Sequence, residues 1–191
     1  MKAALKTNKI ANIYVEKLIR EASDNFSYNR DYDLALEQVN QILAIDNHNV
    51  KALILKGDIL FCMDEDVQAL EHFEMAINAD PFCAEAHGSK AGVLDVLGNY
   101  KEALNHCDQA FKLISNKDKF LLPSLYDQKL TLLIRLRRFE EAQRVIIKAL
   151  NTLPEDDANY IRACYKSIVD CSYKLKKRKQ AQVEKLSLKV I

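Results

Sequence analysis

Residues 57–81 read GDILFCMDEDVQALEHFEMAINADP, and this stretch decides the fold. Its dipeptide Ala69-Leu70 also stands at residues 35-36 and 103-104, so the same pair returns every 34 residues. A fixed period of this length is typical of repeat proteins, in which each unit is a helix pair that buries its apolar face only against its neighbours. The sequence therefore predicts a stack of helix pairs.

Other positions repeat at the same offsets from each alanine. Three residues earlier stand Tyr32, Asp66 and Tyr100, and seven residues later stand Ile42, Ala76 and Ala110. A fourth copy, displaced by five inserted residues near 118–122, contains Phe139, Ala142, Ala149, Leu150 and Pro154. Because several positions share these offsets, a chance match of two common residues does not explain the recurrence of Ala-Leu.

This pattern resembles the tetratricopeptide repeat, a helix-turn-helix unit of 34 residues. The resemblance rests on the small pair at Lys56-Gly57, the alanine at Ala69, the aromatic at Phe73 and the proline at Pro81, and it covers about residues 16–154. It implies an all-α fold, a right-handed superhelix (solenoid) of four helix pairs plus a divergent C-terminal pair.

We expect a single solenoid domain over residues 1–191. Its repeats are expected at about 16–49, 50–83, 84–117 and 123–156, followed by a degenerate repeat or cap at 157–191. In that last segment, helices are predicted at about 157–175 and 178–190.

Small residues predict where paired helices cross. Gly57 facing Ala69, and Ala91 facing Ala103, would let two helix axes approach to about 8–10 Å. The fourth copy has Leu130 in place of the glycine, so its two helices are expected to cross at a different distance or angle.

The turns between repeats differ in a second way. Pro81 and Pro154 cannot continue a helix and are expected to end one. Asn47 and Ser115 stand where this proline would recur, so those two turns are expected to be less firmly set.

Composition fits a helical protein. The chain has 191 residues, 49% apolar residues, four glycines and three prolines, and no run of eighteen apolar residues. Its first residues lack the apolar core of a secretory signal, which favours the cytoplasm. Five cysteines without a CxxC pair indicate reduced, mostly buried thiols.

Catalytic and metal sites are not indicated. Cys83 and His87 could share a helix face, but a structural zinc site needs two further ligands, so no metal and no cofactor are predicted. His72 and His106 occupy equivalent places, expected on the outer side of the stack. With no phosphate loop or nucleophile arrangement, we predict that the chain is not an enzyme.

The first helix of each pair is expected to line a concave groove that binds a partner. The expected groove residues are Lys17, Arg20, Ile54, Leu55, Asp58, Phe61, Gly88, Gly92, Val96, Gln128, Thr131, Ile134 and Arg135. An apolar strip within this set would suit an extended peptide or an amphipathic helix. Alternatively, these side chains contact one another or the terminal helix, and no ligand binds.

Some proteins of the resembled family grip a partner's terminal carboxylate with lysine, asparagine and arginine. The corresponding positions here hold Arg20, Asp24, Leu55, Glu85 and Ser89, which would not hold an anion. A carboxylate-clamp interaction with a chaperone is therefore disfavoured.

The chain ends are basic, although its net charge is only +1. A basic run consists of Lys174, Lys176, Lys177, Arg178 and Lys179. It could contact nucleic acid, an anionic membrane surface or an acidic partner, but a solvated end of the stack is favoured over these alternatives. The apolar residues 186–191 could dock on the repeats, pair with a second copy or continue into further sequence.

The sequence therefore predicts a non-enzymatic protein-interaction module, a scaffold or adaptor that binds a peptide or helix of a protein partner in its groove. The alternatives are a chaperone-like holder of an apolar client segment and polyanion or membrane-surface binding through the basic run. The identity of the partner is not encoded in any motif of the chain.

Overall fold

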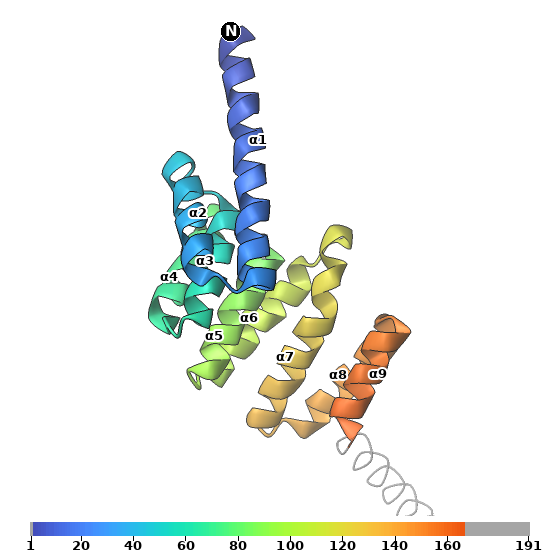
Figure 1. Cartoon of the computed structure of the whole chain (residues 1–191). Helices are drawn as coiled ribbons and strands as arrows, with labels where there is room; N and C mark the ends of the chain where they lie inside the picture. Colours follow the sequence, from blue (N-terminus) through green and yellow to red (C-terminus); the bar gives the residue numbers. More distant parts are fainter. Residues whose placement is uncertain (1, 167–191) are drawn as a thin grey trace, which may run out of the picture. The chain divides into compact units, whose positions relative to one another are not determined.

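The computed structural model describes residues 2–166, and all regular secondary structure in this part of the chain is helical. The α-helices are α1 (Lys2–Asp24), α2 (Tyr32–Ile45), α3 (Val50–Cys62), α4 (Asp66–Ala79), α5 (Ala84–Val96), α6 (Tyr100–Leu113), α7 (Leu122–Arg135), α8 (Phe139–Thr152) and α9 (Glu155–Cys164) (Figure 1). The predicted all-α class is confirmed. The helix expected at 178–190 and the basic run at 174–179 lie outside the described residues.

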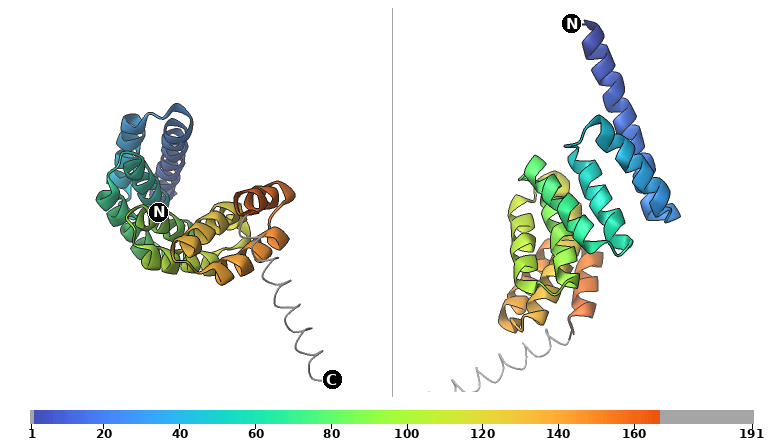
Figure 2. Two further views of the ribbon diagram at one scale, coloured as in Figure 1. Left: turned by 90° about the horizontal axis from the view of Figure 1, so that it is seen from below. Right: turned by 90° about the vertical axis from the view of Figure 1, so that its left-hand side faces the viewer.

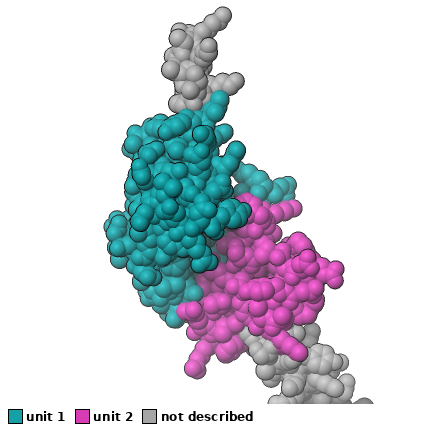
Figure 3. All heavy atoms as spheres, viewed as in Figure 1, with its two compact units in different colours: residues 1–118 teal, residues 119–191 magenta. Residues whose placement is uncertain are grey.

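The chain divides into two compact units, residues 1–118 and 119–191 (Figure 3). In the first unit α1 packs on α2, α3 on α4 and α5 on α6, and in the second α7 packs on α8 and α8 on α9. The boundary falls at the five inserted residues, where a 3-10 helix, η2 (Asn116–Leu121), precedes α7. Pro123 stands in the first turn of α7, where its missing N–H costs no helical hydrogen bond.

The helix bounds follow the sequence period with one large difference. Helix α1 begins at Lys2, well before the expected start of the first repeat near residue 16, and extends past the other helices of its unit (Figures 1 and 2). It ends in a π-helical turn, η1 (Asn25–Asn29), which leads to α2. The 34-residue unit therefore locates the paired part of α1 but not its whole length.

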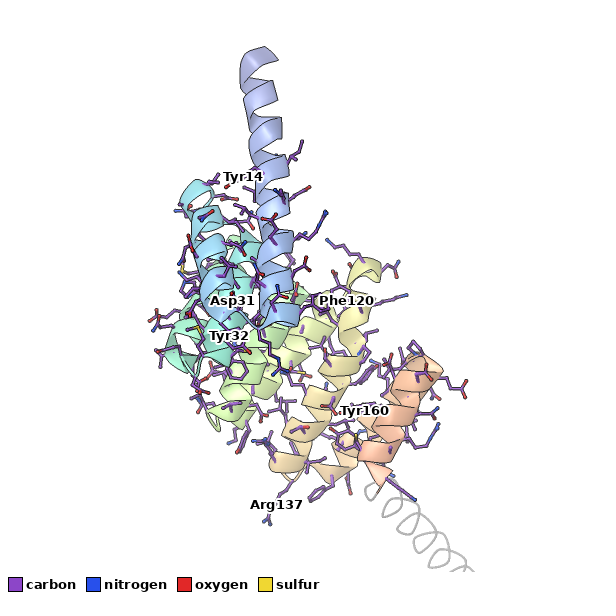
Figure 4. All side chains as sticks on the ribbon, viewed as in Figure 1. Tyr14, Asp31, Tyr32, Phe120, Arg137 and Tyr160 are labelled. Carbon is purple, nitrogen blue, oxygen red and sulfur yellow. The ribbon has the colours of Figure 1, made fainter. Side chains whose placement is uncertain are left out.

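The turn inside each described helix pair contains a residue with positive φ. This φ is 54° at Arg30, which follows the π-helical turn η1, and 63° at Asp64, 79° at Gly98 and 57° at Arg137, which follow α3, α5 and α7. The amides that follow Asp64, Gly98 and Arg137 donate to the carbonyl five residues earlier, over 2.9, 2.9 and 2.8 Å. This pattern is the Schellman motif, which satisfies carbonyls at a helix end. Figure 4 places Arg137 at such a turn, between α7 and α8.

The turn at Asn47 has nearly the same geometry as the turn at Pro81. It was expected to be less firmly set than the turn at Pro81, yet the preceding residues Asp46 and Asp80 have nearly identical dihedrals, φ −141° and ψ 94° against φ −140° and ψ 95°. Both aspartates accept a hydrogen bond from the amide two residues later, at 3.2 Å for Asp46 and 3.0 Å for Asp80. The aspartate side chain sets this turn, so proline is dispensable there.

The crossing of α3 and α4 also differs in its partner. Gly57 was expected to face Ala69, but a Cβ placed at Gly57 would lie 2.5 Å from Cε1 of Phe73, closer than real Cβ contacts. Phe73 is completely buried, and its ring occupies the space that the glycine leaves. Ala69 is also fully buried, so small residues line the crossing as predicted, with an aromatic ring filling it.

Candidate functional site

The first unit contains a pocket of about 250 Å³ between the first helices of its three pairs. The pocket is lined by Ile19, Ser23, Lys51, Ile54, Leu55, Asp58 and Glu85. These residues come from α1, α3 and α5, which are neighbours because each first helix of a pair packs near the next. The pocket is smaller than the roughly 300–1,000 Å³ typical of small-molecule sites, and its size suits one long side chain.

Asp58 gives the pocket its main polar group. Asp58 is half-buried at the pocket, and this burial raises the pKa of its carboxyl group to about 7. The negative charge of Glu85 raises this pKa further, whereas a hydrogen bond donated by Ser89 of α5 lowers it. The Asp58 carboxyl is therefore poised between its neutral and charged forms near neutral pH.

Glu85 and Lys51 form the more open part of the lining. Burial raises the pKa of Glu85, and the positive charge of Lys51 lowers it in part. Lys51 is exposed, on the first turn of α3. The pocket thus has two carboxyl groups and one amine, with apolar walls from Ile54 and Leu55.

The structure brings together only some of the predicted groove residues. Ile54, Leu55 and Asp58 line the pocket, but Ile54 is only 4% exposed and belongs to the core, which corrects its expected place on an open apolar strip. Phe61 is half-buried and packs against the same core, whereas Val96 is 62% exposed. The middle of the face is therefore mixed in character, because Ile54 and Phe61 pack into the core, whereas Val96 is exposed and Asp58 lies at the pocket.

The remaining predicted positions of the first unit do not line the pocket. Lys17 and Arg20 are exposed on α1, and Lys17 pairs with Glu21 at 3.4 Å. Gly88 and Gly92 are half-buried on α5. Sequence reasoning missed Ile19, Ser23, Lys51 and Glu85 as pocket residues, since only the packing of α1, α3 and α5 places them there.

In the second unit, the face of α7 is contacted by the end of α9. The Tyr165 hydroxyl donates to the Asp127 carboxylate at 2.9 Å and lies 3.2 Å from the Thr131 hydroxyl. Thr131 and Tyr165 are one period apart, so they occupy equivalent places in successive repeats. Gln128 and Ile134 are half-buried and Arg135 is exposed. One expected groove residue, Thr131, therefore contacts Tyr165 next to the C-terminal end of α9.

A histidine pair lies between α5 and α6. Nδ1 of His87 and Nδ1 of His106 are 3.0 Å apart, and the rings stack with centroids 5.3 Å apart. His106 was expected on the outer side, so its contact with the buried His87 is a correction. Burial lowers the pKa of both rings, and Lys90, which forms an ion pair with Glu74, lowers them further. A hydrogen bond between the two Nδ1 atoms requires that one of them carry a proton and the other accept it.

The cysteines differ from the expectation of mostly buried thiols. All four described cysteines are free, yet only Cys107 is buried, while Cys62 and Cys164 are exposed and Cys83 is half-buried. Residues 2–166 contain no group of three or more His, Cys, Asp or Glu side chains that could hold a metal ion. In the same part of the chain, no helix has the length and apolar character needed to cross a membrane.

Two curated relatives match part of the chain. One is the DnaJ homolog subfamily C member 7 homolog of Schizosaccharomyces pombe, which is 30% identical over 129 residues, covering 61% of this chain and 27% of that protein. The other is FK506-binding protein 59 of Drosophila melanogaster, which is 31% identical over 96 residues, covering 50% of this chain and 19% of that protein. The chain therefore spans roughly a quarter or less of these relatives. No protein-family model matches the chain.

Solved structures show the same fold at low sequence identity. MamA has a TM-score of 0.60 and 20% identity, covering 78% of this chain and 84% of its own. The Yersinia enterocolitica chaperone SycD, in complex with a peptide of the translocator YopD, has a TM-score of 0.57, 18% identity and coverages of 64% and 94%. The first tetratricopeptide repeat domain of Spaghetti (RPAP3), bound to an HSP90 peptide, has a TM-score of 0.56, 14% identity and coverages of 64% and 93%. These similarities and the 34-residue period together identify the chain as a protein with the superhelical tetratricopeptide-repeat fold that its sequence predicted.

Proposed function

We propose that this chain is a non-enzymatic protein-interaction module that holds a peptide segment of a partner protein against α1, α3 and α5. The observation that carries the proposal is the pocket itself, which draws its lining from the first helices of three successive pairs. A peptide lying across such a face contacts several repeats at once, which suits an extended ligand better than a small molecule.

The similar structures support this proposal in general terms. SycD and the Spaghetti (RPAP3) domain were each solved with a peptide of another protein. Because their sequence identity to this chain is low, they show only that the fold is shared. We therefore do not assign their particular partners to this chain. What supports peptide binding here is a fold with peptide-bound examples together with a side-chain pocket on the expected face.

We favour a scaffold or adaptor over a holder of long apolar segments. A holder needs a continuous apolar surface, whereas Ile54 is withdrawn into the core and the pocket contains Asp58 and Glu85. The mixed lining favours a short segment with both apolar and polar side chains.

A randomised peptide library displayed on phage would test the proposal. We would pan it against the full chain, against Leu55→Gln in the pocket, and against Val67→Gln as a matched control on the exposed side of α4, where Val67 is 69% exposed. We expect peptides that bind the wild type and the control equally but bind Leu55→Gln at least about tenfold more weakly. Failure to enrich any peptide, or equal binding to all three proteins, would refute the assigned face.

A further inference from the structure

We propose that the pocket between α1, α3 and α5 accepts a lysine or arginine side chain of the partner peptide, with Asp58 as the acceptor of its charged end. This inference rests on the proposed function, because it specifies the peptide chemistry that the same face recognises. A carboxylate clamp binds a negatively charged group, whereas this pocket would bind a positively charged one. The sequence already disfavours a carboxylate clamp at this position.

The state of Asp58 is the first support. Ser89 donates a hydrogen bond to its carboxyl group, and none of the described lysines or arginines forms an ion pair with it. A carboxylate held away from water without a cation is costly, and the group responds by retaining its proton to a higher pH. A positively charged side chain entering the pocket would remove that cost and leave the carboxylate charged.

The rest of the lining suits the same guest. Ile19 and Leu55 offer apolar contact to the methylene stem of a lysine or arginine, whose charged end would reach Asp58. Glu85 adds a second negative group, and its charge is already felt by Asp58. A guest carboxylate would meet two like charges, so an acidic peptide end is excluded from this pocket.

Lys51, the basic residue of the pocket lining, does not take the place of the partner's lysine or arginine at Asp58. Lys51 acts on Glu85, whose pKa it lowers, and its side chain is exposed. The groups that shift the pKa of Asp58 are instead Ser89 and Glu85. We therefore place Lys51 with Glu85 at the outer part of the pocket, and the guest cation at Asp58.

The panned peptides provide the test. Among those that lose affinity for Leu55→Gln, we expect a lysine or arginine at one fixed position. A synthetic peptide of this set, labelled with fluorescein, would be titrated by anisotropy against wild type, Asp58→Asn and the control Asp33→Asn on the exposed start of α2. We expect Asp58→Asn to weaken binding roughly 10- to 100-fold and Asp33→Asn to leave it unchanged. Replacing the peptide's basic residue with glutamine should weaken wild-type binding by a similar factor but leave Asp58→Asn nearly unaffected.

A pH series adds a signature that a purely structural role of Asp58 would not give. Wild-type affinity for the basic peptide should rise from pH 5.5 to pH 8 as Asp58 loses its proton, and Asp58→Asn should show a flatter profile. The groups that face Asp58 are Ser89, Glu85 and Cys62, with Lys51 acting on Glu85. Because burial raises the pKa of Cys62, its thiol stays neutral across this range.

The outcomes separate the two proposals. If no peptide binds this face, the proposed function fails. If peptides bind the face but carry no basic residue, prefer an acidic one, or bind Asp58→Asn as tightly as wild type, only the cationic pocket fails. Asn is close to Asp in shape and can still accept the Ser89 hydrogen bond, so the folded state should survive; equal melting temperatures would verify this.

Discussion

A methyl group added at Gly57 should disrupt the crossing of α3 and α4. In the Gly57→Ala variant the new Cβ would lie 2.5, 2.7 and 2.8 Å from Cε1, Cζ and Cδ1 of Phe73. Carbon atoms pack best at about 3.5–4.0 Å, so the ring or the helix must move by about 1 Å. The Phe73 ring has no exposed surface and therefore no solvent side toward which to move.

Two opposing effects determine the size of the change. Overpacking a core typically costs about 1–3 kcal/mol, whereas alanine in place of glycine within a helix gains about 1 kcal/mol. The single variant therefore mixes the two. In a Phe73→Leu background the clashing ring atoms are absent, so Gly57→Ala should there be neutral or stabilising. The difference between the two backgrounds isolates the clash, and we expect about 1–3 kcal/mol.

Urea unfolding of wild type, both single variants and the double variant, followed by far-ultraviolet circular dichroism, would measure this coupling. A coupling free energy below about 0.5 kcal/mol would show that Gly57 and Phe73 do not share the crossing. The packing described for α3 and α4 would then be wrong.

Three further outcomes follow from the same structure. Gly98→Ala should destabilise the protein by roughly 1–2 kcal/mol, because φ is 79° at this position and no atom lies near the new Cβ to offset the backbone strain with a contact. Arg137→Gly should stabilise the protein, because glycine adopts a positive φ without this strain. Melting temperatures that move in the opposite directions would contradict this. Because burial lowers the pKa of His87 and His106, these two residues bind more protons in the unfolded chain below pH about 6.5, so their contribution to stability should fall on acidification, opposite in sign to that of Asp58, whose pKa is raised. His106→Gln should lose less stability than wild type between pH 7 and pH 5 in guanidinium unfolding, and equal losses would argue against the pair. Tyr165→Phe should cost about 1–3 kcal/mol through its lost bond to a carboxylate, and an unchanged urea midpoint would refute that contact.

The period of the sequence was enough to predict the helix pairs, because regularly spaced small and apolar residues are what such pairs need in order to stack. It located the inserted residues before α7, which the structure shows as η2. It also predicted a small-residue crossing at Gly57 with larger residues such as Phe73 around it, and the structure places the Phe73 ring directly against that glycine. Residue spacing fixes which positions face inward; it does not fix which side chain fills a given gap.

The candidate site was predicted less completely. Leu55 and Asp58 were expected on the binding face, but the withdrawal of Ile54 and the burial of the Asp58 carboxyl depend on how α1, α3 and α5 pack. The contact of His87 with His106 likewise joins two helices of one pair, and no local pattern announces it. Electrostatic properties of this kind follow from tertiary contacts, which one sequence does not display.

The short helix η2 has a consequence for how such chains can change in length. Gly98 and Arg137 both adopt a left-handed conformation, although the residues inserted between them make their separation longer than one 34-residue period. An added segment at this junction is thus absorbed while the internal hydrogen bonds of the helix pairs on both sides persist. Natural lineages could lengthen the protein here, and an epitope or a fluorescent label inserted between Asn116 and Leu121 should leave the α5–α6 and α7–α8 hairpins folded.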